Sequence, residues 1–331
     1  MSMGLSWTFP FSCVLLLLLN AAVYSKTLKR DVKALNSIKA SLGWKVVYAW
    51  VGDDPCGEGD VAPWVGIKCS PAIEGEYRVI TELELFGVSI VGPFPVSVTN
   101  MLDLKKLDLH GNKLTGPIPP QIGQLQNLET LNLRWNKLQD QIPPEIGKLK
   151  KLRNLYLSFN SLKGPIPKEL GNLLELRYLY LHENRLTGRV PQEIGSLPNL
   201  RHLDLSNNHL TGTLHELLRN DGCFPSLHYL YLNDNWLTGG IPSQLASIVN
   251  LEILYLSHNK LTGPVPEALA FLPRLAYLYL NNNMLTGKIP EAFYQHQALK
   301  ELYIEGNNFS SGVKPVGVHR TMELSDSEFL F

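Results

Sequence analysis

The sequence predicts an α/β repeat fold, a solenoid of about ten 24-residue coils with a parallel β-sheet on its concave side. The pattern L-x-x-L-x-L-x-x-N-x-L recurs at steps of 24 residues, except for one step of 27. Within each L-x-L segment apolar and polar residues alternate, as in a strand with one buried face. One coil cannot bury its leucines alone, so each coil needs its neighbours. The copies begin at Ile80, Leu104, Leu128, Leu152, Leu176, Leu200, Leu227, Leu251, Leu275 and Leu299.

An asparagine follows the strand segment of every coil after the first. Where the chain turns away from a buried strand, backbone groups need partners, and a short amide side chain can both donate and accept there. We interpret these residues as a structural ladder rather than as solvated turn residues, because they recur in register with the leucines. They are Asn112, Asn136, Asn160, Asn184, Asn208, Asn235, Asn259, Asn283 and Asn307.

Most coils continue after the asparagine as L-T-G-x-I/V-P, for example over residues 114–119. Glycine permits a positive φ, and proline suits an edge that needs no ladder donor. This segment resembles the plant-type extracellular subclass of leucine-rich repeats, which is found in receptor-kinase ectodomains, receptor-like proteins and secreted polygalacturonase inhibitors. The resemblance covers Ile80 to about Asn308 and the cap before it, and we take residues 78–310 as the predicted solenoid. It implies a fold and a subclass much more strongly than it implies a particular partner.

Residues 26–77 precede the repeats and are expected to cap the exposed end of the first coil. Val32, Leu35, Ile38 and Leu42 recur at helical spacing, which predicts an amphipathic helix.

Two short motifs in this segment resemble the N-terminal cap of the same family. They are D-P-C at residues 54–56 and W-x-G-x-x-C at residues 64–69. The resemblance implies that Cys56 and Cys69 form a disulfide in an oxidising compartment. Metal ligation is the competing interpretation, but two thiols without further Cys or His nearby fall short of a zinc site. Cys223 is interpreted as a small buried hydrophobe, with intermolecular pairing as the alternative.

Residues 1–25 carry no charged side chain and contain an apolar run at residues 13–19. The run is short for a transmembrane helix and is followed by small residues, so we predict a cleaved secretory signal peptide that includes Cys13. No second long apolar run follows, so the mature chain is expected to lack a transmembrane segment. The predicted location is the extracellular space or the cell wall.

The last coil contains one glycosylation sequon, Asn308-Phe309-Ser310. Residues 311–331 form a C-terminal cap or tail without the paired cysteines that many relatives carry there. Five apolar residues in it could cover the last coil by packing instead, namely Met322, Leu324, Phe329, Leu330 and Phe331.

The sequence offers no catalytic, metal or cofactor site. Lys plus Arg and Asp plus Glu both number 30, so no basic excess invites nucleic acid. There is no G-x-S-x-G elbow, no phosphate-binding glycine loop, no kinase motif and no cluster of His and Cys ligands. His215-Glu216 begins like a zinc-protease motif, but Arg219 stands where the second histidine is required. The 27-residue coil is expected to carry a surface loop and a helical turn at residues 213–218.

Strand alternation points a row of residues out of the concave face. The row is charged or polar in the N-terminal half, as at Asp108 and Asn132, and rich in tyrosine in the C-terminal half. Cross-strand aromatic pairs can merely stabilise a sheet. Such a long row also fits a binding strip, because Tyr and Trp are favoured interface anchors. The predicted partner-binding residues are Tyr156, Tyr178, Tyr180, Tyr229, Tyr231, Tyr255, Tyr277, Tyr279 and Tyr303, with Arg134, Trp135 and Phe159 at the transition.

Two functional classes follow. The first is a secreted recognition module that binds a protein or peptide, together with a membrane receptor kinase as the resemblance implies, with roles in signalling, development or defence. Inhibition of a secreted polygalacturonase is a narrower alternative within that class. The second class is a structural cell-wall protein that binds carbohydrate.

Three histidines fall at outward positions of the predicted strands, and they motivate a hypothesis of pH-dependent binding between pH 5 and 7. They are His110, His182 and His202. The alternative interpretation is that these residues are solvated and have no role.

Overall fold

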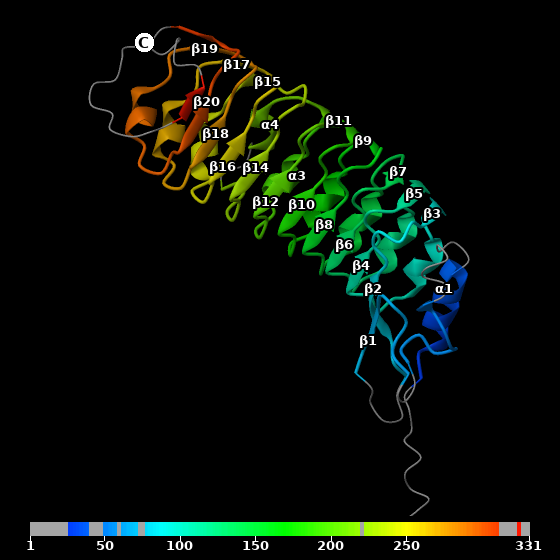
Figure 1. Cartoon of the computed structure of the whole chain (residues 1–331). Coiled ribbons are helices and arrows are strands. Elements are labelled where there is room, and N and C mark those ends of the chain that lie inside the picture. The colour runs from blue at the N-terminus through cyan, green and yellow to red at the C-terminus, as the bar shows by residue number, and fades with distance from the viewer. Residues whose placement is uncertain are drawn as a thin grey trace, which may run out of the picture.

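A computed structural model shows the chain as a curved solenoid with the N-terminal cap at one end (Figure 1). The structure describes residues 26–39, 49–57, 61–71, 77–218 and 222–310, and the backbone of residues 323–325. The predicted signal peptide, residues 1–25, lies outside the described residues, and so do the side chains of the C-terminal tail. The predicted leucine-rich repeat solenoid is confirmed.

The concave side is one continuous sheet of 12 strands, each contributed by a successive segment of the chain. The first pair, β1 and β2, is antiparallel, and all later pairs are parallel. Equivalent residues of neighbouring coils face each other, as at Tyr178, which pairs with Asn154 and His202. The strands are β1 (Ile67–Cys69), β2 (Ile80–Glu84), β4 (Lys106–Asp108), β6 (Thr130–Asn132), β8 (Asn154–Tyr156), β10 (Tyr178–Tyr180), β12 (His202–Asp204), β14 (Tyr229–Tyr231), β16 (Ile253–Tyr255), β18 (Tyr277–Tyr279), β20 (Glu301–Tyr303) and β22 (Glu323–Ser325).

A second set of short strands forms where the L-T-G segments of successive coils meet. These strands make three small parallel sheets of three, three and four strands. They are β3 (Val91–Pro93), β5 (Lys113–Gly116) and β7 (Lys137–Leu138); β9 (Lys163–Pro165), β11 (Arg185–Arg189) and β13 (His209–Thr211); and β15 (Thr238–Gly240), β17 (Lys260–Gly263), β19 (Met284–Gly287) and β21 (Asn308–Phe309).

The convex side of the described coils is made mostly of single 3₁₀ turns, each of which follows a proline. Neighbouring turns pack closely: a Cβ on Gly147 would lie 2.3 Å from the Glu169 carbonyl oxygen, so only glycine fits there. The turns are η1 (Val96–Asn100), η2 (Pro120–Gln124), η3 (Pro144–Lys148), η4 (Lys168–Asn172), η5 (Ser243–Ser247), η6 (Glu267–Phe271) and η7 (Glu291–Gln295), with the short α-helices α3 (Gln192–Gly195) and α4 (Leu214–Leu217) at equivalent places.

The core is a stack of leucines between the two sides. In the coil that contains β10, Leu176, Leu179, Leu181 and Leu186 are all fully buried. Because every coil repeats these positions, the buried leucines form one continuous cluster along the solenoid. Each of these positions is buried against the coils on either side, which explains why apolar residues occupy them.

The asparagines form the predicted structural ladder. The Asn136 side-chain amide donates to the carbonyl oxygens of Leu109 at 2.9 Å and Leu133 at 3.2 Å. Its oxygen accepts a hydrogen bond from the Leu114 backbone N–H at 2.9 Å. Each asparagine thereby joins two coils and satisfies backbone groups that the turn leaves without partners. The ladder interpretation is confirmed, and the solvated-turn interpretation is wrong.

The N-terminal cap begins with α1 (Lys29–Lys39), which buries Ala34, Leu35 and Ile38. Its Asp31 is also fully buried, because the carboxylate accepts the backbone N–H of Ile80 at 3.0 Å. Ile80 is the first residue of β2, so this bond ties the helix directly to the first coil. The predicted Leu42 lies outside the described residues.

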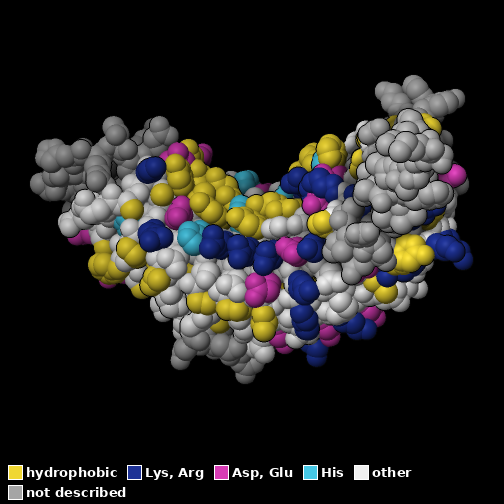
Figure 2. Space-filling view, turned by 90° about the horizontal axis from the view of Figure 1, so that it is seen from below, with side chains coloured by type: hydrophobic (Ala, Val, Ile, Leu, Met, Phe, Trp, Pro, Cys, Tyr) yellow, Lys and Arg dark blue, Asp and Glu magenta, His cyan; other side chains and the backbone are white. Residues whose placement is uncertain are grey.

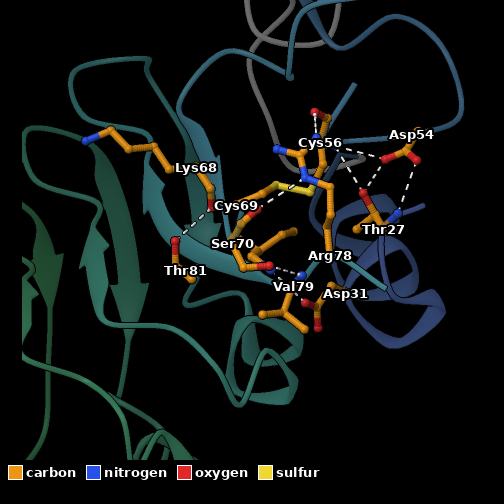
Figure 3. The surroundings of a disulfide bond; sticks show 11 residues. Thr27, Asp31, Asp54, Cys56, Lys68, Cys69, Ser70, Arg78, Val79 and Thr81 are labelled. Carbon is orange, nitrogen blue, oxygen red and sulfur yellow. Dashed lines mark hydrogen bonds between the residues drawn. A yellow bond between two sulfur atoms is a disulfide. The ribbon is translucent and has the colours of Figure 1, made fainter. Parts of the chain in front are cut away.

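The cap contains the disulfide between Cys56 and Cys69, with a Cα–Cα distance of 5.9 Å (Figure 3). Polar side chains surround it. The Arg78 guanidinium donates to the Cys56 carbonyl oxygen at 2.8 Å, and the Cys56 backbone N–H donates to Asp54 at 3.0 Å. The bridge joins the segment after α1 to the strand that pairs with the first coil.

The 27-residue coil carries the predicted helical turn as α4. Thr213 and Glu216 form a capping box at its start. Cys223 lies 5% exposed, and its thiol donates to the Leu217 carbonyl oxygen at 3.9 Å. This environment matches the interpretation of Cys223 as a buried hydrophobe.

Candidate functional site

The sheet alternation presents aromatic side chains along the concave face. In β10, Leu179 is fully buried, whereas Tyr178 and Tyr180 on either side of it are partly exposed. Since the strands are in register, each ring stands beside the equivalent residue of the next coil. Figure 2 shows the result as a continuous hydrophobic stripe along the hollowed face.

The C-terminal half of this stripe is a series of tyrosine contacts. The ring centroids of Tyr231 and Tyr255 are 5.1 Å apart. Tyr255 and Tyr279 follow at 3.9 Å, and Tyr279 and Tyr303 at 4.7 Å in a stacked arrangement. Aromatic pairs at such distances contribute about 0.5–1.5 kcal/mol beyond their area burial.

Two histidines continue the series where the tyrosines are interrupted. His202 lies 4.5 Å from Tyr180 and 5.2 Å from Tyr231, between ring centroids. His182 lies 5.9 Å from Tyr180 and 5.1 Å from Phe159. Sequence reasoning treated both histidines only as titratable groups, although their register beside the tyrosines could have identified them as ring partners.

The N-terminal end of the series is the stacked pair of Trp135 and Phe159, with centroids 3.7 Å apart. Both residues have left-handed backbone, with φ of 55° and 54°. Most equivalent positions of other coils carry residues that tolerate this conformation, such as Gly111 and Asn207, although Glu183 adopts it too. The left-handed backbone at Trp135 and Phe159 therefore lowers the stability of the fold. Such strain clusters at functional sites in proteins.

We call this connected set of rings the aromatic ladder. Every adjacent pair in it is joined by a ring contact or by a shared neighbour. Its members are Trp135, Phe159, Tyr156, Tyr180, His182, His202, Tyr231, Tyr255, Tyr279 and Tyr303.

The remaining predicted residues lie beside the ladder. The Arg134 guanidinium sits 5.2 Å above the Tyr156 ring, a cation–π distance. Tyr178 contacts Tyr180 edge-on at 6.4 Å, and Tyr229 lies 5.2 Å from His202. Tyr277 faces the Lys300 ammonium at 5.7 Å.

A partly buried carboxylate lies at the middle of the ladder. Asp204 lies 2.9 Å from His182 Nδ1 and accepts the Ser206 hydroxyl at 2.7 Å. Burial opposes ionisation of Asp204, but the hydrogen bonds from His182 and Ser206 outweigh it, so its pKa is below its ordinary value.

Burial lowers the pKa of His202 to about 4, against the attraction of Asp204. His202 is therefore neutral between pH 5 and 7 and does not contribute to the hypothesised pH dependence of binding, which stays a prediction for His110 and His182.

Three tyrosine hydroxyls of the ladder are held in the protonated form by raised pKa values. Burial raises the pKa of Tyr180 and of Tyr231 to about 12. Burial also raises the pKa of Tyr279, whose hydroxyl donates to the Glu301 carboxylate. These groups therefore offer neutral hydroxyls that can donate and accept hydrogen bonds.

The N-terminal part of the concave face differs because its charges are already matched. The Lys68 ammonium lies 2.8 Å from Glu82, and Lys106 lies 3.2 Å from Glu84. Asp108 and Asn132, which alternation places on the outward side, are buried because Asn132 donates to Asp108 at 3.1 Å.

An aromatic residue that sequence reasoning missed lies in this N-terminal part. Phe86 is 48% exposed and stacks on His110 with ring centroids 4.9 Å apart. Its position at the end of the first coil's strand segment was the available signal.

The predicted glycan acceptor lies away from the ladder. Asn308 is exposed on β21, in one of the small sheets. Its glycosylation stays a prediction.

Two further findings apply to the residues that the structure describes. None of their helices is both long and apolar enough to cross a membrane. No group of three or more His, Cys, Asp or Glu side chains in the described ranges could hold a metal ion.

The repeats and the ladder define a solenoid with one broad concave face lined by aromatic rings, and comparison with known proteins identifies its family. The model of the family "Leucine rich repeat" matches residues 102–162, 150–210, 225–285 and 249–309, which together are more than half of the chain. The chain belongs to the leucine-rich repeat family. A comparison with curated protein sequences gives no match.

Solved structures of plant proteins are similar to this chain. The plant peptide hormone receptor RGFR1 in complex with RGF2 is 35% identical, with a TM-score of 0.64, over 68% of this chain and 36% of that one. The ectodomain of the Arabidopsis thaliana receptor kinase GASSHO1/SCHENGEN3, in complex with CASPARIAN STRIP INTEGRITY FACTOR 2, is 31% identical. Its TM-score is 0.61, and the match covers 68% of this chain and 30% of that one. A plant ice-binding protein is 28% identical, with a TM-score of 0.75, over 88% of this chain and 91% of that one.

The chain thus spans about a third of the length of the two receptor ectodomains. Leucine-rich repeat ectodomains are typically binding modules rather than enzymes.

Proposed function

We propose that this chain is a secreted recognition module whose aromatic ladder binds an extended peptide or protein segment. The observation that carries the proposal is the uninterrupted series of rings from Trp135 to Tyr303, which begins with two rings held in left-handed backbone. Sheet stability alone does not require an exposed Trp at a strained position. Trp135 is 55% exposed. Rigid rings with a polar tip supply contact area at low entropic cost, so they are favoured as interface anchors.

The comparisons support the same class of ligand. Two of the similar structures are plant receptors, and one of these is a peptide hormone receptor in complex with RGF2. The cap disulfide suits an oxidising compartment, in line with secretion. We extend the proposal to action beside a membrane receptor kinase in cell-surface signalling.

The proposal is tested by capture with the mature chain, residues 26–331, from a cell-wall and membrane extract. The expected result is salt-resistant capture of a defined peptide or protein. A variant with Tyr231→Ala and Tyr255→Ala should lose that capture, whereas the convex variant Glu145→Ala should keep it.

Other outcomes assign the chain differently. Capture of a polygalacturonase whose activity falls on binding would favour the inhibitor alternative. Release of the chain from wall material by oligosaccharide, with no protein captured, would favour a structural wall role. Capture that the double tyrosine variant retains in full would contradict the proposed site.

A further inference from the structure

A row of arginines borders the aromatic ladder on the side where the strands begin. Arg153, Arg177 and Arg201 each directly precede the first residue of β8, β10 and β12. Their backbones are joined, since Arg177 N–H donates to the Arg153 carbonyl oxygen at 2.8 Å and Arg201 N–H to that of Arg177 at 2.8 Å. Adjacent strands lie roughly 4.8 Å apart, so the three side chains leave the sheet at that spacing. Figure 2 shows basic side chains in a row along the border of the hydrophobic stripe.

The charges of this row are incompletely matched. Arg153 pairs with Glu129 at 3.1 Å. No ion pair joins Arg177 or Arg201 to any carboxylate among the residues that the structure describes. Two guanidinium groups therefore stand beside the ladder ready for an anionic partner.

Two carboxylates near the row are already engaged. Asp204 is held by His182 and Ser206. Glu252 accepts the Tyr229 hydroxyl at 3.2 Å. No ion pair among the described residues therefore neutralises Arg177 or Arg201, in contrast to the matched lysines and glutamates at the N-terminal end of the face.

Two acidic residues lie on the opposite border of the ladder. Glu183 and Asp234 follow the ends of β10 and β14, at the positions that Trp135 and Phe159 occupy in earlier coils. Glu183 is exposed. An elongated ligand on the ladder thus meets the arginine row along one side, whereas the other side carries these two acidic residues together with Arg134.

We propose that the ladder between β8 and β14 binds an extended peptide with two acidic residues two positions apart, whose carboxylates pair with Arg177 and Arg201. This inference rests on the proposed function and deepens it by naming the chemistry of the ligand. In an extended peptide, side chains two positions apart lie on one side and are separated by roughly 6.7 Å. The two arginines leave the sheet at the narrower spacing of neighbouring strands, but their side chains are long enough to reach carboxylates at the wider spacing of the peptide. The planar guanidinium also matches a carboxylate with two parallel hydrogen bonds.

The test is selection from a displayed library of random peptides of about twelve residues, which span roughly 40 Å when extended. The immobilised mature chain should enrich peptides with the pattern acidic-x-acidic. The charge-reversed variant Arg177→Glu/Arg201→Glu should instead enrich basic-x-basic. The matched control Lys148→Glu reverses an exposed basic residue on the convex turn η3 and should keep the acidic pattern.

Affinity measurements on selected peptides complete the test. Replacing either acidic residue by its amide, or Arg201 by Ala, should weaken binding about tenfold. Selected peptides that depend on Tyr231 but show no acidic pattern would overturn this inference and leave the proposed function intact. Peptides that bind independently of Tyr231 and Tyr255 would overturn both.

The same variants distinguish an acidic polysaccharide ligand from an acidic peptide ligand. Oligogalacturonate that binds more tightly than every selected peptide, and loses its binding in Arg177→Glu/Arg201→Glu, would assign the row to wall polysaccharide. That result would overturn the peptide inference.

Discussion

Phe159 combines a large aromatic ring with a left-handed backbone, and its replacement separates a binding role from a folding role. Its φ is 54°, and its ring contacts Trp135 at 3.7 Å and His182 at 5.1 Å. The chain itself uses Asn at the equivalent positions 207 and 282, with nearly the same φ. Phe159→Asn therefore substitutes a residue that the repeat already accepts at this place.

The expected change in stability is small because two terms oppose each other. A left-handed conformation costs an ordinary residue about 1–2 kcal/mol, and Asn tolerates it better. Loss of the two ring contacts costs about 0.5–1.5 kcal/mol each. The free energy of unfolding should thus change by no more than about 2 kcal/mol. Affinity for the partner should fall about tenfold, because an anchor of the ladder is removed.

Urea unfolding followed by circular dichroism measures the first quantity, and titration calorimetry with the captured partner measures the second. The reciprocal variant Asn207→Phe should destabilise the chain by about 1 kcal/mol, since it adds strain without the stacking partner that Trp135 provides. A loss of 3 kcal/mol or more in Phe159→Asn, with unchanged affinity, would refute the reasoning and make the ring a packing residue.

Three other predictions concern the scaffold. Leu181→Ala should cost about 2–5 kcal/mol in urea unfolding because the side chain is fully buried, and Tyr180→Ala should cost much less; equal losses would show that the strand register is wrong. Replacing Cys56 and Cys69 together by Ala should lower stability by roughly 3 kcal/mol in thermal unfolding, and an unchanged unfolding temperature would contradict this. His202 has a folded pKa of about 4 and an unfolded value near 6.5, so the unfolded state binds more protons between these values. Stability should therefore fall as pH drops from about 6.5 to about 4, and His202→Phe should flatten this slope; an equally steep slope in the variant would exclude His202 as its cause.

The solenoid could be predicted from the sequence because its determinants are local and repeated. Leucine spacing specifies which face of each strand is buried, and the asparagine specifies how the chain turns, so one coil such as the one containing Leu179 and Asn184 describes the others. The cap helix followed from the same periodicity. Its buried Asp31 did not, because one oxygen of that carboxylate accepts a hydrogen bond from Ile80, 49 residues away, while the other pairs with Arg30.

The candidate site could be predicted only in part for a related reason. Strand alternation identified the tyrosines as one row, since a period of two is visible in the sequence. The ring contacts made by His182 and His202 depend on rotamers and on the side chains of neighbouring coils. The left-handed backbone of Trp135 was likewise hidden, because nothing in an isolated Trp-Asn dipeptide indicates a positive φ. Whether Arg177 and Arg201 form ion pairs with carboxylates could likewise be read only from the three-dimensional structure.

The measurement that tests the central claim most directly is the affinity of the captured partner for three variants of the mature chain. Tyr231→Ala and Tyr255→Ala remove rings from the middle of the ladder, and Glu145→Ala changes the convex turn η3. Each tyrosine variant should bind at least about tenfold more weakly, which corresponds to roughly 1.4 kcal/mol, while its circular dichroism spectrum stays that of the folded chain. Glu145→Ala should bind normally. Normal binding by both tyrosine variants, with a loss in Glu145→Ala, would show that the ladder only packs the sheet and that the partner binds elsewhere.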